Sequence, residues 1–114
     1  MSLREPRGEE ERVRNWILPC LLLFLAACDQ KFSPVEQGAR VYAANCTACH
    51  NPDPRLEGVM GPPVFGSSRA LLEAKLIHAS YPPGYTPKRD TQLMQPLPYL
   101  APQIPALAVF LNAR

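Results

Sequence analysis

The sequence has little net charge and no long hydrophobic segment. Its 114 residues include 12 Lys and Arg against 10 Asp and Glu, which gives a formal charge of +2 at pH 7. A nucleic-acid-binding domain would show a strongly basic surface, so this balance argues against that class. The longest uncharged apolar run, residues 16–27, is too short to cross a membrane, because a spanning helix needs about 20 apolar residues. The length suits one domain.

Proline, in contrast, is abundant. The chain has 14 prolines in 114 residues, about 12% against a typical ~5%. Proline fixes its backbone angle and lacks an N–H, so long helices and regular sheets are not expected. Most of the prolines fall in residues 51–66 and 80–99, which we therefore expect to be loops.

The apolar run near the N-terminus has the length of a signal-peptide core. Residues 16–27 read WILPCLLLFLAA, and two arginines just before them supply a positive flank. The run ends in residues 25–28, LAAC, which resemble the lipobox of bacterial lipoproteins. In that family the cysteine is lipidated and the bond before it is cut. The resemblance thus implies a lipoprotein signal peptide over residues 1–27 and a lipid anchor on Cys28.

Two points about this segment stay open. An ordinary signal peptide whose small-residue cleavage site precedes a cysteine is the alternative to the lipoprotein. Residues 1–12 carry four glutamates beside three arginines, so either translation starts near Val13 or the n-region is long and unusual. In enteric lipoproteins an aspartate after the lipidated cysteine retains the protein in the inner membrane. By that resemblance, Asp29 implies a location on the periplasmic side of that membrane.

Residues 33–114 are expected to form one small all-α domain behind a short tether, residues 28–32. Ser33 can cap a helix, proline follows it, and Glu36 completes a capping box. Apolar spacing predicts two more helices. The three expected helices run from residue 34 towards residue 46, from Ser68 through Ile77, and from Pro102 through Leu111, with no strand between them.

Residues 46–50 read CTACH, a C-x-x-C-H motif. Two thiols three residues apart on a helical turn can reach the two vinyl groups of a porphyrin. The imidazole of His50 can then point at the iron. The motif matches the signature for covalent attachment of c-type haem through Cys46 and Cys49.

Three other readings of the motif compete. A redox dithiol would place its cysteines at a helix N-terminus, where the dipole stabilises a thiolate, whereas these follow a helix. A zinc site needs four ligands, and only Cys46, Cys49, His50 and the remote His78 are at hand. A disulfide between the two cysteines would close a very small loop.

With its surroundings, the motif resembles a class I cytochrome c of the short bacterial type. In that family a glycine and an aromatic residue of the first helix pack against an apolar and an aromatic residue of the last. Gly38 and Tyr42 match the first pair, and Leu107 and Phe110 match the second. The resemblance implies a small cytochrome c fold, with three main helices and proline-rich loops around one covalently attached haem.

The same resemblance implies the residues on both sides of the iron. His50 would be one axial ligand, and the carbonyl oxygen of Pro62 would accept a hydrogen bond from its imidazole. Met94, in a loop before the last helix, would be the second axial ligand, with His78 and Met60 as the other candidates. Donors for the haem propionates would come from Tyr81, Tyr85, Lys88 and Arg89. The alternative for the two basic residues is that they are solvated charges of a loop.

The resemblance implies an electron carrier and not an enzyme. With His50 and Met94 on the two axial positions no coordination site stays open, so catalysis at the metal is not expected. The expected cofactor is one haem c, with iron held by these two residues. The alternatives are a haem subunit of a larger dehydrogenase, and a haem-based sensor or peroxidase-like protein, which would need an exchangeable iron position.

The expected partners are redox proteins of the same membrane. Residues 29–32 span at most about 14 Å when extended, so an anchor on Cys28 would keep the domain near the membrane surface. A quinol-oxidising complex or a terminal oxidase fits this geometry. Neither a nucleic acid nor a small-molecule substrate is expected.

Overall fold

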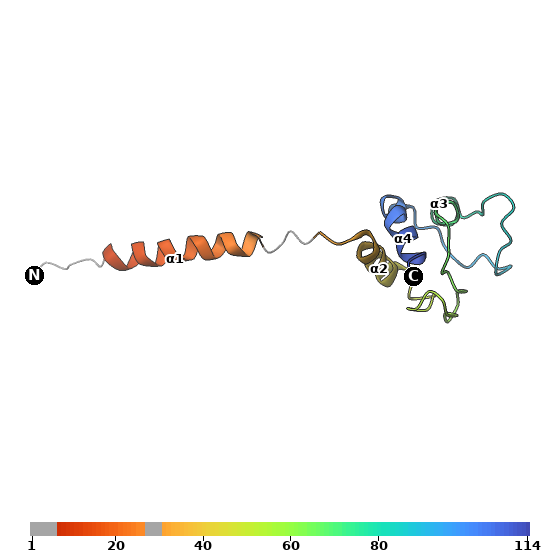
Figure 1. Cartoon of the computed structure of the whole chain (residues 1–114), viewed down its shortest axis with the longest axis horizontal. Helices are drawn as coiled ribbons and strands as arrows, with labels where there is room; N and C mark the ends of the chain where they lie inside the picture. Colours follow the sequence, from red (N-terminus) through yellow and green to blue (C-terminus); the bar gives the residue numbers. More distant parts are fainter. Residues whose placement is uncertain (1–6, 27–30) are drawn as a thin grey trace, which may run out of the picture. The chain divides into compact units, whose positions relative to one another are not determined.

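The computed structural model describes residues 7–26 and 31–114, and the chain divides into two compact units, Met1–Lys31 and Phe32–Arg114 (Figure 1). The first unit contains helix α1, Arg7–Ala26. None of the described helices has both the length and the apolar character that a membrane span requires. Cys28 and Asp29, the expected lipidation site and the residue after it, lie outside the described residues.

The second unit is built from helices α2 (Pro34–Asn45), α3 (Arg69–His78) and α4 (Ile104–Leu111), with the 3-10 helix η1 (Pro98–Gln103) leading into α4. Neither described range contains a β-strand, which confirms the predicted all-α class. Residues between these elements are irregular, as their prolines predict. Figure 1 shows α2 and α4 side by side, with α3 next to α4 and a long loop after α3.

Helix α2 begins with the capping box that the sequence predicts at Ser33 and Glu36. The Ser33 hydroxyl accepts a hydrogen bond from the Glu36 backbone N–H at 3.3 Å. The Glu36 carboxylate in turn accepts one from the Ser33 backbone N–H at 2.9 Å. These bonds hold the pKa of Glu36 below its usual value. Because both partners are exposed, the box fixes the helix boundary more than it stabilises the domain.

The last helix begins later than predicted. The sequence places its start at Pro102, whereas in the structure Pro102 lies inside η1 and α4 starts at Ile104. An α-helix starting at Pro102 would need a donor at Pro105, and proline has no N–H. A start at Ile104 puts Pro105 in the first turn, where no donor is needed. The preceding prolines form a short 3-10 helix instead.

Helices α2 and α4 cross closely at Gly38. A Cβ on Gly38 would lie 2.6 Å from the Cβ of Phe110 and would also collide with the backbone carbonyl of Ala106. One turn along α2, the Tyr42 ring lies 5.4 Å from the Phe110 ring, centroid to centroid. Gly38 and Tyr42 were predicted to pack against the last helix, and their contacts with Phe110 confirm this. The buried core around this crossing consists of Tyr42, Leu72, Leu76, Leu100, Ile104, Leu107 and Leu111.

Candidate functional site

The CTACH motif follows directly from the end of α2. Cys46 is the C-cap residue, and its backbone N–H donates to the carbonyl oxygen of Tyr42 at 2.9 Å. The chain then turns tightly, because the backbone N–H groups of Cys49 and His50 both donate to the carbonyl oxygen of Cys46, at 3.3 and 2.9 Å. This turn brings two thiols and an imidazole to the C-terminal end of one helix.

The hydroxyl of Tyr42 secures the chain after the motif. It donates a hydrogen bond to the carbonyl oxygen of Asn51 at 2.6 Å, and the side chain is 2% exposed. Burial, reinforced by the nearby Cys46 and Asp53, raises the pKa of Tyr42 to about 12. The phenol therefore stays protonated at physiological pH, so it keeps its donor role, and the segment around His50 stays tied to α2.

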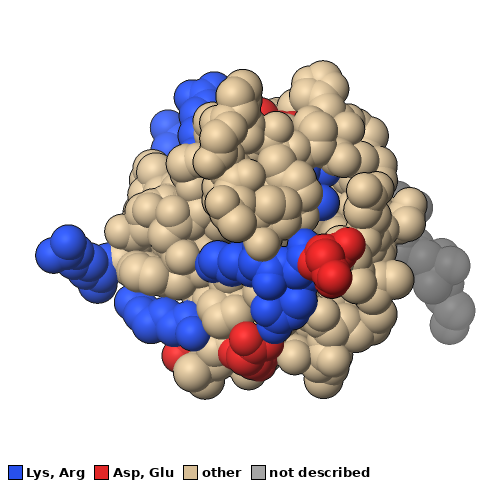
Figure 2. All heavy atoms as spheres, turned by 90° about the vertical axis from the view of Figure 1, so that its right-hand side faces the viewer, with Lys and Arg blue, Asp and Glu red and all other residues tan. Residues whose placement is uncertain are grey.

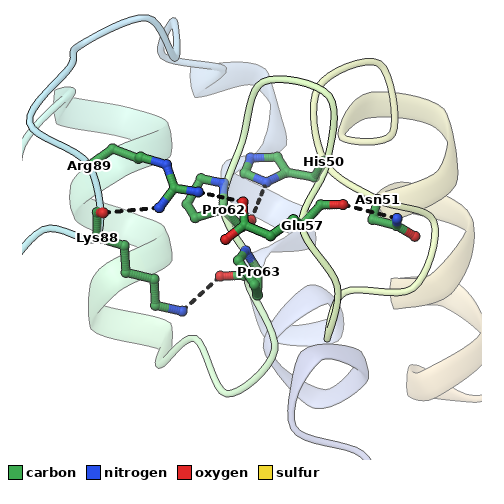
Figure 3. Close-up of polar contacts among 7 residues, drawn as sticks. All are labelled: His50, Asn51, Glu57, Pro62, Pro63, Lys88 and Arg89. Atoms are coloured by element: carbon green, nitrogen blue, oxygen red, sulfur yellow. Dashed lines mark hydrogen bonds and ion pairs between the residues drawn. The ribbon is translucent and has the colours of Figure 1, made fainter.

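The ring of His50 is held by the loop over residues 58–62. Its Nδ1 lies 2.9 Å from the carbonyl oxygen of Pro62 (Figure 3). Because a carbonyl oxygen only accepts, Nδ1 carries the proton of the neutral ring and Nε2 keeps a free electron pair. This is the contact that the family resemblance implies for Pro62, and the tautomer is the one that a metal-ligating histidine needs.

Two glycines allow this loop to approach the motif. A Cβ on Gly61 would come within 2.5 Å of His50 Nδ1, and a Cβ on Gly58 would lie 2.6 Å from the Cα of His50. The backbone N–H groups of Met60 and Gly61 donate to the carbonyl oxygen of Cys49, at 3.2 and 2.9 Å. Position 61 therefore has no room for a side chain next to the His50 ring, and position 58 has none next to the His50 backbone. Sequence analysis did not single out Gly58, although its spacing from Gly61 in a proline-rich loop is a signal for close backbone approach.

A cavity of about 360 Å³ lies beside the motif, and its volume is in the range of ligand pockets. Cys46, Cys49 and His50 line one side of it. The cavity connects segments that are far apart in the sequence, because α3, α4 and the chain between residues 81 and 97 all contribute. The apolar part of its wall includes Val64, Leu71, Leu72, Leu76, Leu93, Leu97, Leu107 and Leu111.

The three candidates for the second axial ligand differ in whether they line the cavity. Met94 and Met60 both line it, with 37% and 59% of their surface exposed. His78 is the last residue of α3, is exposed, and is not part of the cavity wall. Met60 belongs to the loop that also contacts His50. Met94 belongs to a separate segment, which lines the cavity independently of that loop.

The four residues expected to serve propionates all line the cavity. The rings of Tyr81 and Tyr85 stack with centroids 5.4 Å apart, and Lys75 Nζ lies 4.4 Å from the centroid of the Tyr81 ring. Lys88 and Arg89 make contacts with the chain itself, to Pro63 and Glu57. On the face shown in Figure 2, basic and acidic side chains lie next to each other on a largely uncharged surface.

The structure argues against the other readings of the CTACH motif. Burial raises the pKa of Cys46 to about 11, so the group is a thiol at neutral pH, whereas a dithiol redox site needs a stabilised thiolate. Cys46 and Cys49 are both free. Among residues 7–26 and 31–114, no group of three His, Cys, Asp or Glu side chains is arranged so that it could hold a metal ion by itself.

The donor set suits an iron porphyrin. Two thiols, one imidazole with a free Nε2 and the thioethers of Met60 and Met94 line a cavity with largely apolar walls. Next to the imidazole, a side chain at position 61 would fill the space that the ring occupies. The residues present therefore fit the group that the motif predicts.

The family model described as Cytochrome C oxidase, cbb3-type, subunit III matches residues 33–95. Comparisons with curated proteins and with solved structures gave no significant match. The matched segment runs from the cap of α2 through the CTACH motif and α3 to the residue after Met94. It covers more than half of the chain. The chain therefore belongs to this cytochrome c family, and its domain is that of a c-type cytochrome, which implies covalently bound haem c and an electron-carrying role.

Proposed function

We propose that the chain is a class I, monohaem c-type cytochrome that carries single electrons on the outer face of the bacterial inner membrane, to which Cys28 anchors it. The observation that supports this most is the convergence of Cys46, Cys49, His50 and Met94 on one cavity. The first three come from one tight turn and the fourth from a segment more than forty residues later.

In this proposal the residues of the chain have separate tasks. Cys46 and Cys49 would hold the haem by thioether bonds, and the imidazole of His50 and the thioether of Met94 would be the protein ligands of its iron. The haem supplies the one-electron chemistry when it is bound. The Pro62 carbonyl fixes the orientation of the imidazole and raises its basicity, because it accepts the Nδ1 proton at 2.9 Å. The apolar wall excludes water, which together with a methionine ligand favours a high reduction potential.

The proposed partner is a membrane-bound respiratory complex. A lipid anchor on Cys28 and a tether of residues 28–32 would keep the domain close to the membrane surface. The description of the matched family names a subunit of a cbb3-type oxidase. This supports a terminal oxidase as partner, and it favours a second candidate function in which the chain is a fixed haem subunit of a larger complex.

Optical spectra with carbon monoxide test the proposed function. The purified holoprotein is recorded oxidised and reduced, with and without the gas. We expect a reversible one-electron change and no shift with carbon monoxide, because both axial positions are filled. A reduced spectrum that shifts fully with carbon monoxide would instead support the haem-based sensor or the peroxidase-like protein.

The lipid anchor is tested by replacing Cys28. We expect Cys28→Ser to abolish incorporation of a labelled fatty acid and to release the protein from the membrane fraction. The matched control is Cys20→Ser, since Cys20 lies within α1 and is not at the lipobox position. This control should keep the label. Recovery of an unlabelled wild-type protein from the periplasm would contradict lipidation.

A further inference from the structure

The segment that carries Met94 is fastened to the domain at two points. Upstream, Lys88 Nζ donates to the carbonyl oxygen of Pro63 at 2.7 Å, and the guanidinium of Arg89 forms an ion pair with the carboxylate of Glu57. Downstream, the backbone N–H of Leu97 donates to the carbonyl oxygen of Leu76 at 2.8 Å. The first point is held by side chains and the second by the backbone next to η1.

Between these two points the chain has no other fastening. Within the described part of the chain, no hydrogen bond holds residues 90–96, and all of them are exposed. Met94 therefore stays at the cavity because both ends of its segment are fixed. If the upstream point is released, the free segment extends back to about residue 86, because the Tyr85 ring before it stacks on the Tyr81 ring.

The upstream fastening ends on the loop that also holds His50. Glu57 and Pro63 flank Pro62, whose carbonyl oxygen lies 2.9 Å from Nδ1 of His50. Figure 3 shows Lys88 and Arg89 approaching this loop from one side and His50 from the other. One short loop thus contacts the side chain of one axial candidate and the segment of the other.

We propose that the clasp, defined as Glu57 with Arg89 and Pro63 with Lys88, positions Met94 for axial ligation. Its members are positioning residues, since they act through the segment that carries the methionine. This proposal rests on the proposed role of Met94. It adds that an exposed ion pair at Arg89, five residues before Met94 in the sequence, sets how firmly the sulfur is held.

The expected effect is modest and measurable. Glu57 and Arg89 are 64% and 41% exposed, so breaking their pair should weaken the positioning by about two- to threefold. Releasing Lys88 as well lengthens the free segment from residues 90–96 to about 86–96. Loop-closure entropy predicts a loss of about twofold for that change alone.

The experiment measures the competition between Met94 and imidazole in the oxidised holoprotein. The readout is the imidazole concentration that removes half of the weak long-wavelength absorption of sulfur bound to iron. We expect Glu57→Gln and Arg89→Gln each to lower it by about two- to threefold. The double variant of these two should lose no more than either alone, because both remove one interaction. Lys88→Leu combined with Arg89→Gln should lower it further, by about four- to sixfold in all.

The matched control is the exposed pair Arg69 and Glu73 on α3, whose ion pair of 3.0 Å lies within one helix. Glu73→Gln should leave the imidazole concentration unchanged. Salt at 1 M should shift the wild type towards Glu57→Gln and leave that variant unchanged, because it screens an exposed pair. If the wild type shows the band but Glu57→Gln and Arg89→Gln require the same imidazole concentration as Glu73→Gln, the clasp is refuted and Met94 ligation stands. A wild type without the band would overturn Met94 ligation and the clasp with it.

Discussion

Replacing Cys46 and Cys49 together by alanine will abolish covalently bound haem. The two thiols flank a tight turn at the end of α2 and line the same cavity. Each is expected to form one thioether, so the double variant has no covalent bond to the porphyrin. In the wild type, haem should stay on the polypeptide through acid-acetone extraction and denaturing electrophoresis. In the double variant no haem should migrate with the chain.

Each single replacement should already lose most of the holoprotein, because one thioether leaves the group poorly oriented toward His50. Cys20→Ala is the control, since this third described cysteine lies in α1. It should retain haem at the wild-type level. Haem that can be extracted from a fully matured wild-type sample would refute covalent attachment.

Met94→Ala will open the iron to external ligands. Met94 lines the cavity from a segment of its own, whereas Met60 lies on the loop that contacts His50. Loss of the thioether should erase the long-wavelength band of the oxidised protein. The reduced protein should then bind carbon monoxide stoichiometrically, whereas the wild type should bind none. This is a change from a carrier to a protein with an open coordination site.

Two companion variants identify the ligand. Met60→Ala and His78→Ala should both keep the band and stay unreactive toward carbon monoxide. A band that survives in Met94→Ala and disappears in Met60→Ala would show that the wrong methionine has been assigned. A low-potential wild type that lacks the band and changes in His78→Ala would instead show bis-histidine ligation.

Local signals made much of the fold predictable. The capping box at Ser33 and the cap at Ser68 involve residues three apart, so the sequence alone determines them. The loops follow from proline, which acts on its own backbone. The prediction was least accurate at the start of the last helix. There, three closely spaced prolines allow more than one start, and the missing donor at Pro105 decides between them.

The candidate site was predictable where its residues are adjacent in the sequence. The CTACH motif needs no tertiary information, and the Pro62 contact was accessible only through the family resemblance. The ion pair of Glu57 and Arg89 spans 32 residues, and nothing in either neighbourhood indicates the other. The contact between Lys75 and the Tyr81 ring was also not predictable, because it depends on the direction of the chain after the end of α3. Pairings of this kind follow from the fold and not from a motif.

The close crossing of α2 and α4 has a consequence for the order in which the domain folds. These helices lie at opposite ends of the unit's sequence, so a growing chain exposes α2 first and α4 last. The contact of Gly38 with Ala106 therefore forms only after nearly the whole unit has emerged, since it joins residues distant in sequence. Until then α2 lacks its main packing partner, and Cys46 at its end stays accessible to any factor that modifies it. Completion of α4 then supplies Leu107 and Leu111 to the wall of the cavity that Cys46 lines.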